Sequence, residues 1–183
     1  MEIIDTTLDG VVEIRPPRHG DDRGWFSETY KKHTFRDAGI DIDFVQDNES
    51  FSAPAGTLRG LHYQLAPHLQ DKLIRVIQGS ILDIAVDIRR DSTTFGQHVA
   101  VTLTADDGNQ LLVPAGFAHG FCTLEADVRV AYKVSGEYSP VCERSIRWDD
   151  PDLAIRWMLP AGGPTLSGKD GIAPFLADQP DLF

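Results

Sequence analysis

The sequence has 183 residues, 42% of them hydrophobic, which is enough for one sizeable core, so we expect a single domain over residues 1–183. Its formal net charge is −11 and its isoelectric point is about 4.8, which disfavours a nucleic-acid or membrane-surface protein, because both partners repel an acidic chain. No apolar run reaches the ~20 residues that span a bilayer, and the only two cysteines, Cys122 and Cys142, lack metal-ligand or redox-motif spacing.

The first half of the chain alternates short β-like runs with turn signals. It predicts one short helix over 31–39 and strands over 24–30, 44–52, 58–64 and 71–79. The run "LRGLHYQ" carries Arg59 and His62, whose odd spacing points them to opposite faces of a regular strand. A bulge at Gly60 is the alternative, because it would re-aim these side chains.

The second half continues the β pattern. The run "SILDIAVDI" (80–88) places four large aliphatic side chains on one face and Asp83 on the other, less apolar face. Asp83 is either solvated or a candidate to orient His119 or Lys72. A second helix is expected over 166–178, and further strands over 98–104, 109–116, 117–124 and 128–134. Many short strands at regular intervals predict an all-β jelly roll with a few short peripheral helices.

Two segments resemble the paired motifs of the cupin superfamily of jelly rolls. The second motif is matched at the superfamily's spacing by Gly108, Pro114, Gly116 and His119, and the first in part, by Gly56 and His62. The resemblance implies a cupin-type barrel.

Two positions depart from the cupin metal motif. Gln64 stands where the second histidine belongs, and Lys72 stands where a glutamate belongs. A cupin metal is bound by neutral histidine and carboxylate groups, whereas lysine brings a positive charge to the same place. We therefore expect no metal. A fixed cation in the barrel still supplies the electrostatic effect of a metal, because it stabilises an oxyanion or enolate.

A narrower resemblance rests on nine blocks spread over about residues 10–178. They read "GDDRGWFSETY", "FVQDNESFS", "LRGLHYQ", "QDKLIRVIQGSILDIAVDIR", "STTFG", "PAGFAHGF", "YKVSGEYSP", "IRWDDPDLAI" and "LSGKD". Together they resemble the dTDP-4-dehydrorhamnose 3,5-epimerase family. The resemblance implies a dTDP-linked 4-keto-6-deoxyhexose as substrate. It also implies epimerisation at C3 and C5 by proton removal and return through an enolate, with no cofactor.

The same resemblance assigns the acid–base roles. His62 is the base, and Asp170 accepts its other ring N–H and so fixes the tautomer. Lys72 stabilises the enolate oxygen at C4. Tyr132 is the acid that reprotonates C5 from the far face, and His119 hydrogen-bonds the sugar.

A nucleotide-binding set follows from the resemblance as well. Arg23 and Arg59 suit the pyrophosphate, because a guanidinium fork matches phosphate oxygens. Tyr138 matches the aromatic residue that stacks on thymine, with Phe26 assisting. The other expected contacts to nucleotide or sugar are Glu28, Gln46, Asp47, Asn48, Glu143 and Lys169. In the family the N-terminal strand crosses to a second subunit, so Arg23 and Glu28 would complete the neighbour's site in a homodimer.

Three alternatives remain open from the residues alone. One is an epimerase of C3 only or C5 only, which needs nearly the same residues. Another is a non-catalytic sugar-nucleotide-binding jelly roll, which the set His62, Lys72, Tyr132 and Asp170 disfavours. A metal-dependent cupin oxygenase is disfavoured by Gln64 and Lys72. The N-terminus lacks a signal-peptide pattern and the cysteines read as reduced thiols, so we expect a cytoplasmic protein.

Overall fold

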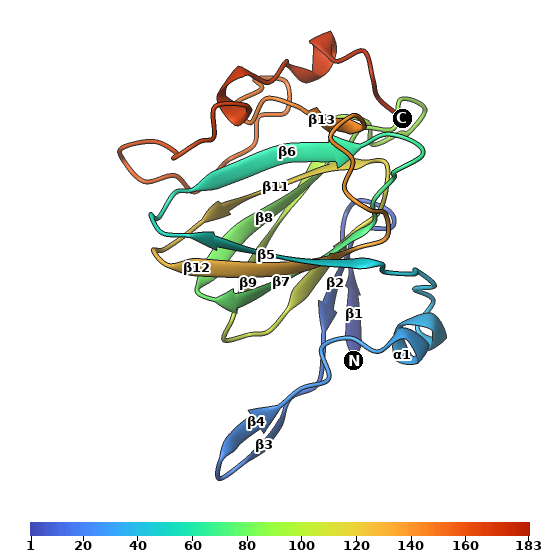
Figure 1. The fold of residues 1–183 in the computed structure, drawn as a ribbon, viewed down its shortest axis with the longest axis vertical. Coiled ribbons are helices and arrows are strands. Elements are labelled where there is room, and N and C mark those ends of the chain that lie inside the picture. The colour runs from blue at the N-terminus through green and yellow to red at the C-terminus, as the bar shows by residue number, and fades with distance from the viewer.

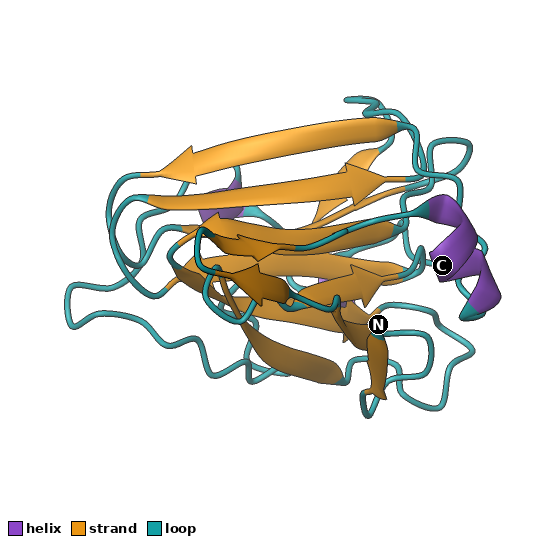
Figure 2. Cartoon of the chain, turned by 90° about the horizontal axis from the view of Figure 1, so that it is seen from below, coloured by secondary structure: helices purple, strands orange, loops and turns teal.

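Two antiparallel β-sheets face each other in the computed structural model, which describes all of residues 1–183 (Figures 1 and 2). The first sheet has the strand order β1 (Glu2–Asp5), β2 (Val12–Arg15), β10 (Gln110–Val113), β7 (Lys72–Gln78), β12 (Val128–Val134) and β5 (Gln46–Ser52). The second has the order β13 (Glu143–Ser145), β6 (Leu58–Gln64), β11 (Phe117–Thr123), β8 (Ser80–Asp87) and β9 (His98–Thr104). The all-β jelly-roll prediction is confirmed.

The peripheral elements are short. A two-stranded hairpin of β3 (His19–Asp21) and β4 (Gly24–Phe26) projects away from the two sheets (Figure 1). The helices are α1 (Lys32–Asp37) and the two 3-10 turns η1 (Asp170–Ile172) and η2 (Leu176–Asp178). None of them is long and apolar enough to cross a membrane.

Several predicted boundaries agree with the structure, and two predictions are wrong. Strands β6, β9 and β12 begin and end at the predicted residues. The helix predicted over 166–178 is only two single turns, because Gly168 and Gly171 weaken a helix and Pro174 removes a backbone donor. The strand predicted over 24–30 ends at Phe26, which lies opposite His19, the first residue of its three-residue partner β3. Strands β1, β2 and β13 are too short for a periodicity signal.

The main core lies between the sheets, and a second one lies outside the five-stranded sheet. The outer core holds Leu82, Ile84 and Val86 of β8, together with buried side chains of the C-terminal segment that arches over β6 in Figure 1. Strand β8 is therefore buried on both faces. Ala85 packs in the core between the sheets, and Asp83, two residues before it, shares that face and is fully buried. The solvated alternative for Asp83 is wrong.

A bulge resolves the spacing of Arg59 and His62. In the pairing of β6 with β11, His119 lies opposite His62 and Phe121 lies opposite Arg59, so three steps on β6 match two on β11. Gly60 sits inside this irregularity with φ +128°, a region that glycine alone adopts without strain, and its backbone touches Gly120. The bulge brings Arg59 and His62 to the wall of one cavity.

Replacing Gly60 by alanine should destabilise the fold. A Cβ at this position would lie 2.6 Å from the Gly120 Cα, in a backbone conformation that disfavours any side chain. We expect a loss of about 2 kcal/mol or more in the free energy of unfolding, measured by urea denaturation. The matched control is Gly162→Ala, an exposed glycine with no atom near its Cβ position, which should change stability by less than about 0.5 kcal/mol. Equal unfolding midpoints for the two variants would contradict the steric account.

Candidate functional site

The candidate site is a polar cavity of about 320 Å³ between the two sheets. Strands β5, β7 and β12 supply one wall, and β6 and β11 supply the other. A second recess of about 240 Å³ shares His62, Lys72, Tyr132, Tyr138 and Glu143 with it, so the two form one continuous depression. Most of the lining side chains are polar or charged, which suits a polar ligand.

His62 and Asp170 form a hydrogen-bonded pair across 108 positions of sequence. The His62 Nε2 lies 2.6 Å from the Asp170 Oδ1, and the Ser167 hydroxyl donates to the other oxygen at 2.8 Å. Burial alone would raise the pKa of Asp170, but the hydrogen bond and charge of His62 and the Ser167 bond lower it below its usual value. An ionised carboxylate there fixes the imidazole tautomer and leaves Nδ1 as the free ring nitrogen.

A second histidine–carboxylate pair lies beside the first. His119 is the cross-strand neighbour of His62, and its Nε2 is 2.7 Å from the Asp83 Oδ1. Asp83 is fully buried on β8, and its Oδ2 has no hydrogen-bond partner. The cavity thus has two histidines side by side, each oriented by its own aspartate.

Lys72 places a positive charge at the same cavity. Its side chain is almost completely buried, and its one hydrogen bond runs from Nζ to the His62 carbonyl at 3.2 Å. Burial lowers the pKa of Lys72 to about 8, while the carboxylates of Asp83 and Glu143 act in the opposite direction. A buried ammonium group without a hydrogen-bonded carboxylate is well suited to stabilise negative charge on a ligand.

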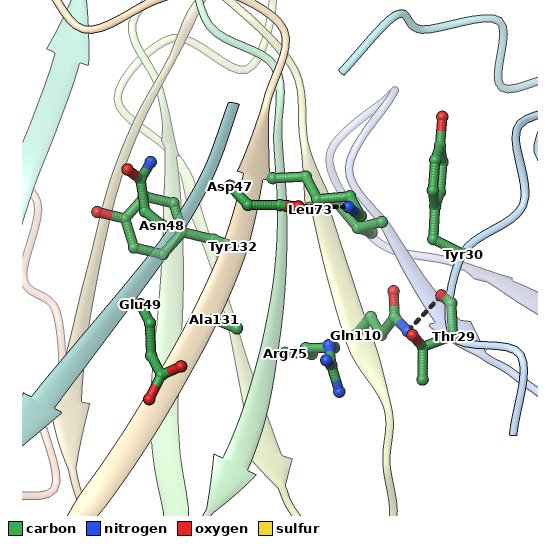
Figure 3. A pocket seen from close by; sticks show the side chains of 11 residues that line it. Thr29, Tyr30, Asp47, Asn48, Glu49, Leu73, Arg75, Gln110, Ala131 and Tyr132 are labelled. Atoms are coloured by element: carbon green, nitrogen blue, oxygen red, sulfur yellow. Dashed lines mark hydrogen bonds and ion pairs between the residues drawn. The ribbon is translucent and has the colours of Figure 1, made fainter. Parts of the chain in front are cut away.

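Tyr132 reaches the cavity from the opposite sheet. It lies on β12 and pairs with Asn48 of β5, and Figure 3 shows these two side chains extending to the same side. Burial raises the pKa of the Tyr132 phenol, so the hydroxyl keeps its proton at neutral pH and is available as a donor.

The rim of the cavity carries most of the expected nucleotide-binding residues. The Lys169 Nζ is 2.7 Å from a Glu143 oxygen, and the hydroxyl of the exposed Tyr138 donates to the other oxygen at 3.2 Å. Gln46 donates to Asn48 and accepts from the Tyr138 backbone N–H. Burial would raise the pKa of Glu143, but the hydrogen bond and charge of Lys169 lower it.

Arg59 completes the rim from β6. Its guanidinium donates to the Phe51 carbonyl and the Ser52 hydroxyl of β5. These bonds hold the arginine at the cavity edge.

Four expected contacts do not meet this cavity in the same chain. Asp47 faces the outer side of β5 and pairs with Lys133 at 2.8 Å, so its side chain points away from the cavity. The reason is alternation, because three consecutive residues of one strand cannot all face one cavity. Arg23 and Phe26 lie on the projecting β3–β4 hairpin (Figure 1). Glu28 follows the hairpin and pairs with Lys31.

Sequence reasoning missed Ser50 and Phe121, which also line the cavity. The Ser50 hydroxyl is buried without a partner. The alternation of β5 could have identified Ser50 from the sequence, because Gln46, Asn48 and Ser50 share the inward face of this strand.

Gln64 is engaged in the fold rather than directed at a ligand. Its Nε2 donates to the His68 and Glu137 carbonyls, and its Oε1 accepts from the Ser139 backbone N–H. All its polar atoms therefore tie together the loops beside the cavity.

A further depression of about 420 Å³ lies on the outer face of the six-stranded sheet (Figure 3). It is lined by Tyr30, Glu49, Arg75 and Gln110, and also by Asn48 and Tyr132, and it contains no histidine. It is larger than the cavity between the sheets but holds no acid–base pair, so we place the chemistry between the sheets.

Comparison with known proteins identifies one family. The sequence profile of the family described as dTDP-4-dehydrorhamnose 3,5-epimerase matches residues 5–178. The dTDP-4-dehydrorhamnose 3,5-epimerase of Sinorhizobium fredii is 48% identical over 170 residues, which cover 93% of this chain and 87% of that protein.

Solved structures give the same result. The crystal structure of the dTDP-4-dehydrorhamnose 3,5-epimerase of Bacillus anthracis, with TDP and PPi bound, matches with a TM-score of 0.92 at 48% identity, covering 95% of this chain and 98% of that chain. The epimerase of Legionella pneumophila in complex with dTDP-4-keto-L-rhamnose gives 0.92 at 45% identity, covering 96% and 93%. The 3'-monoepimerase ChmJ of Streptomyces bikiniensis is less similar, with 0.87 at 35% identity, covering 95% and 87%.

Replacing Lys72 by methionine should raise the free energy of unfolding at pH 7. The folded state keeps this group charged although its pKa is lowered from 10.5 to about 8, a penalty of roughly 3 kcal/mol at most. The penalty is full below the folded pKa of about 8. It vanishes as the pH rises toward 10.5, where the unfolded lysine also loses its proton. The increase in the free energy of unfolding of Lys72→Met over wild type should therefore be largest at pH 7 and should shrink above pH 8. Urea denaturation at each pH measures it.

The matched control for this prediction is Lys133→Met, which removes a lysine from an ion pair on the outer face. Its effect on the free energy of unfolding should stay within about 1 kcal/mol and should not follow the same pH course. A lower stability of Lys72→Met than wild type at pH 7 would contradict the burial penalty.

Proposed function

The chain belongs to the dTDP-4-dehydrorhamnose 3,5-epimerase family and is therefore an isomerase of a sugar nucleotide, and we propose that its reaction takes place in the cavity around His62. The reaction is epimerisation of dTDP-4-keto-6-deoxy-D-glucose at C3 and C5. One observation supports the placement: His62 and Tyr132 line one cavity from strands of opposite sheets, and Lys72 lines the same cavity.

The first step is removal of a proton beside the ketone. The protons at C3 and C5 are acidified by the carbonyl at C4, and His62 takes one of them. Asp170 supports this step because its carboxylate favours the imidazolium that forms. The electron pair moves to the C4 oxygen, and Lys72 stabilises the resulting enolate charge. Only protons move, so these steps call for no redox cofactor.

Return of a proton completes the inversion. Tyr132 donates it at C5 from the face opposite His62, because β12 and β6 belong to different sheets. The raised pKa of Tyr132 supports this role, since the phenol is protonated when the enolate forms. His62 then releases the proton it gained to solvent, and Tyr132 takes up a proton from solvent to replace the one it donated.

The rim holds the nucleotide. Arg59 and Lys169 offer cationic groups to the pyrophosphate, and the exposed ring of Tyr138 is available to stack on thymine. Gln46, Asn48 and Glu143 line the adjoining recess, and His119 faces the sugar from β11. The relatives solved with TDP and with dTDP-4-keto-L-rhamnose support a ligand of this chemistry.

Two alternatives are less well supported. ChmJ is described as an epimerase of one position, and the chain is more similar to the 3,5-epimerases than to that protein. A non-catalytic binding module gives no reason to bury Lys72 beside two histidine–aspartate pairs. Both cysteines are unpaired, which supports the proposed cytoplasmic location.

We also propose that the active unit is a homodimer with shared sites. The hairpin of β3 and β4 leaves the body of the chain and exposes two aromatic side chains, Trp25 at 60% and Phe26 at 69% (Figure 1). Adjacent exposed aromatics of this kind mark an interaction surface. Arg23 and Glu28 do not meet their own cavity, and on a neighbour they would add the second arginine of the pyrophosphate site.

Incubation with dTDP-4-keto-6-deoxyglucose in deuterated water tests the reaction. Deuterium at both C3 and C5, read by mass spectrometry and NMR, is the expected result. Incorporation at one carbon supports the one-position alternative, and none at either carbon excludes catalysis. His62→Asn should lower exchange at both positions by about a hundredfold or more, whereas the control His98→Asn on β9, away from the cavity, should not.

Mixing inactive variants tests the shared site. Co-expressed His62→Asn and Arg23→Ala chains should recover about a quarter of the wild-type rate, because one site of each mixed dimer has an intact base and an intact partner hairpin. Co-expressed His62→Asn and Tyr132→Phe chains are the control, since both residues lie in one cavity and no mixed dimer regains a complete site. Equal rates in the two mixtures would contradict hairpin exchange.

A further inference from the structure

Asp83 is a fully buried carboxylate on β8, an interior strand of the five-stranded sheet. A charge of this kind is costly to bury unless partners compensate for the lost water. Asp83 lies on the inward face of β8, opposite Phe121 of β11, which itself lines the cavity. It is therefore placed behind the cavity wall.

The hydrogen bonds of Asp83 are incomplete, unlike those of the other buried aspartates. Its Oδ1 is bonded to His119 at 2.7 Å, and its Oδ2 has no partner. Asp170 has a bond at each oxygen, and Asp87 accepts from Arg89, Ser92 and Thr94. Buried polar atoms are usually hydrogen-bonded, as those of Asp87 are. One oxygen of the Asp83 carboxylate thus remains without a hydrogen-bond partner inside the barrel.

The negative charge of Asp83 acts on Lys72. The charged and titratable groups that share the cavity with Lys72, or lie behind its wall, are Arg59, His62, Asp83, His119, Tyr132, Tyr138, Glu143, Lys169 and Asp170. Only Asp83 and Glu143 counteract the lowering of its pKa by burial. Glu143 is bonded to Lys169 at 2.7 Å, which offsets its charge. Asp83 has no cation bonded to it.

We propose that Asp83 is a positioning residue of the epimerisation, which holds the His119 ring toward the sugar and is the fixed negative charge that Lys72 faces inside the barrel. This inference rests on the proposed function. Through His119 it orients a group that touches the sugar. Through Lys72 it keeps the enolate-stabilising group cationic at neutral and mildly alkaline pH.

Asp83→Asn tests the inference, because the change keeps the shape and removes the charge. In wild type, kcat should fall as the pH rises above about 8, where Lys72 loses its proton. In the variant this alkaline limb should move to lower pH by about half a unit or more, with kcat at pH 8 reduced by about twofold or more. If Asp83→Asn does not fold, Asp83→Ser, which is smaller and keeps an acceptor for His119, gives the same readout.

The matched control is Asp87→Asn on the same strand. It removes a buried charge that is fully bonded far from the proposed chemistry, so it should lower the unfolding temperature without moving the alkaline limb. If the role of Asp83 were purely structural, both variants should have a lower unfolding temperature and an unchanged pH dependence of kcat. An alkaline limb of kcat that does not move in Asp83→Asn overturns the inference. Wild-type deuterium exchange is measured alongside. Its absence would instead refute the epimerase activity itself.

Discussion

Lys72 is a positive charge that the fold buries without a hydrogen-bonded carboxylate. Its one hydrogen bond goes to a backbone carbonyl, whereas each of the neighbouring charged groups has a specific partner: His62 with Asp170, His119 with Asp83, and Glu143 with Lys169. Lys72 is therefore a buried cation without a bonded counter-ion. Its interaction with a bound molecule becomes more favourable when negative charge develops on that molecule, which is the condition for stabilising an enolate more than a ketone.

The two-sheet architecture decides where acid and base can stand. The proposed base His62 lies on β6 of one sheet and the phenol of Tyr132 on β12 of the other, so a sugar ring bound between them would meet one on each face. Regular alternation alone would turn either Arg59 or His62 away from the cavity. The bulge opposite His119 and Phe121 avoids this, and Gly60 permits it by its conformation and its lack of a Cβ. Arg59, the proposed anion contact, and His62, the proposed base, thus lie on the same strand.

The strands and part of the site could be predicted from local sequence, and the rest depends on tertiary contacts. Alternation located β6, β9 and β12, and motif spacing singled out His62, Lys72 and His119. The pairing of His62 with Asp170 spans 108 positions and came only from family resemblance. The burial of Asp83 escaped local reasoning because the aliphatic face of β8 packs under the C-terminal segment, outside the barrel, while its less apolar face lines the interior. Alternation identifies the more apolar face of a strand but does not show whether the other face meets water.

The two histidine–aspartate pairs differ in a way that matches different tasks. Asp170 has both oxygens bonded, one to the His62 imidazole and one to the Ser167 hydroxyl, which suits the proposed role of His62 in gaining and losing a proton in each turnover. Asp83 has one oxygen bonded and one free of partners, on a strand held from both sides by β9 and β11. A rigid carboxylate with spare charge acts over a distance rather than through a single bond. The same side chain can therefore orient one histidine while its charge counteracts the lowering of the pKa of Lys72 by burial.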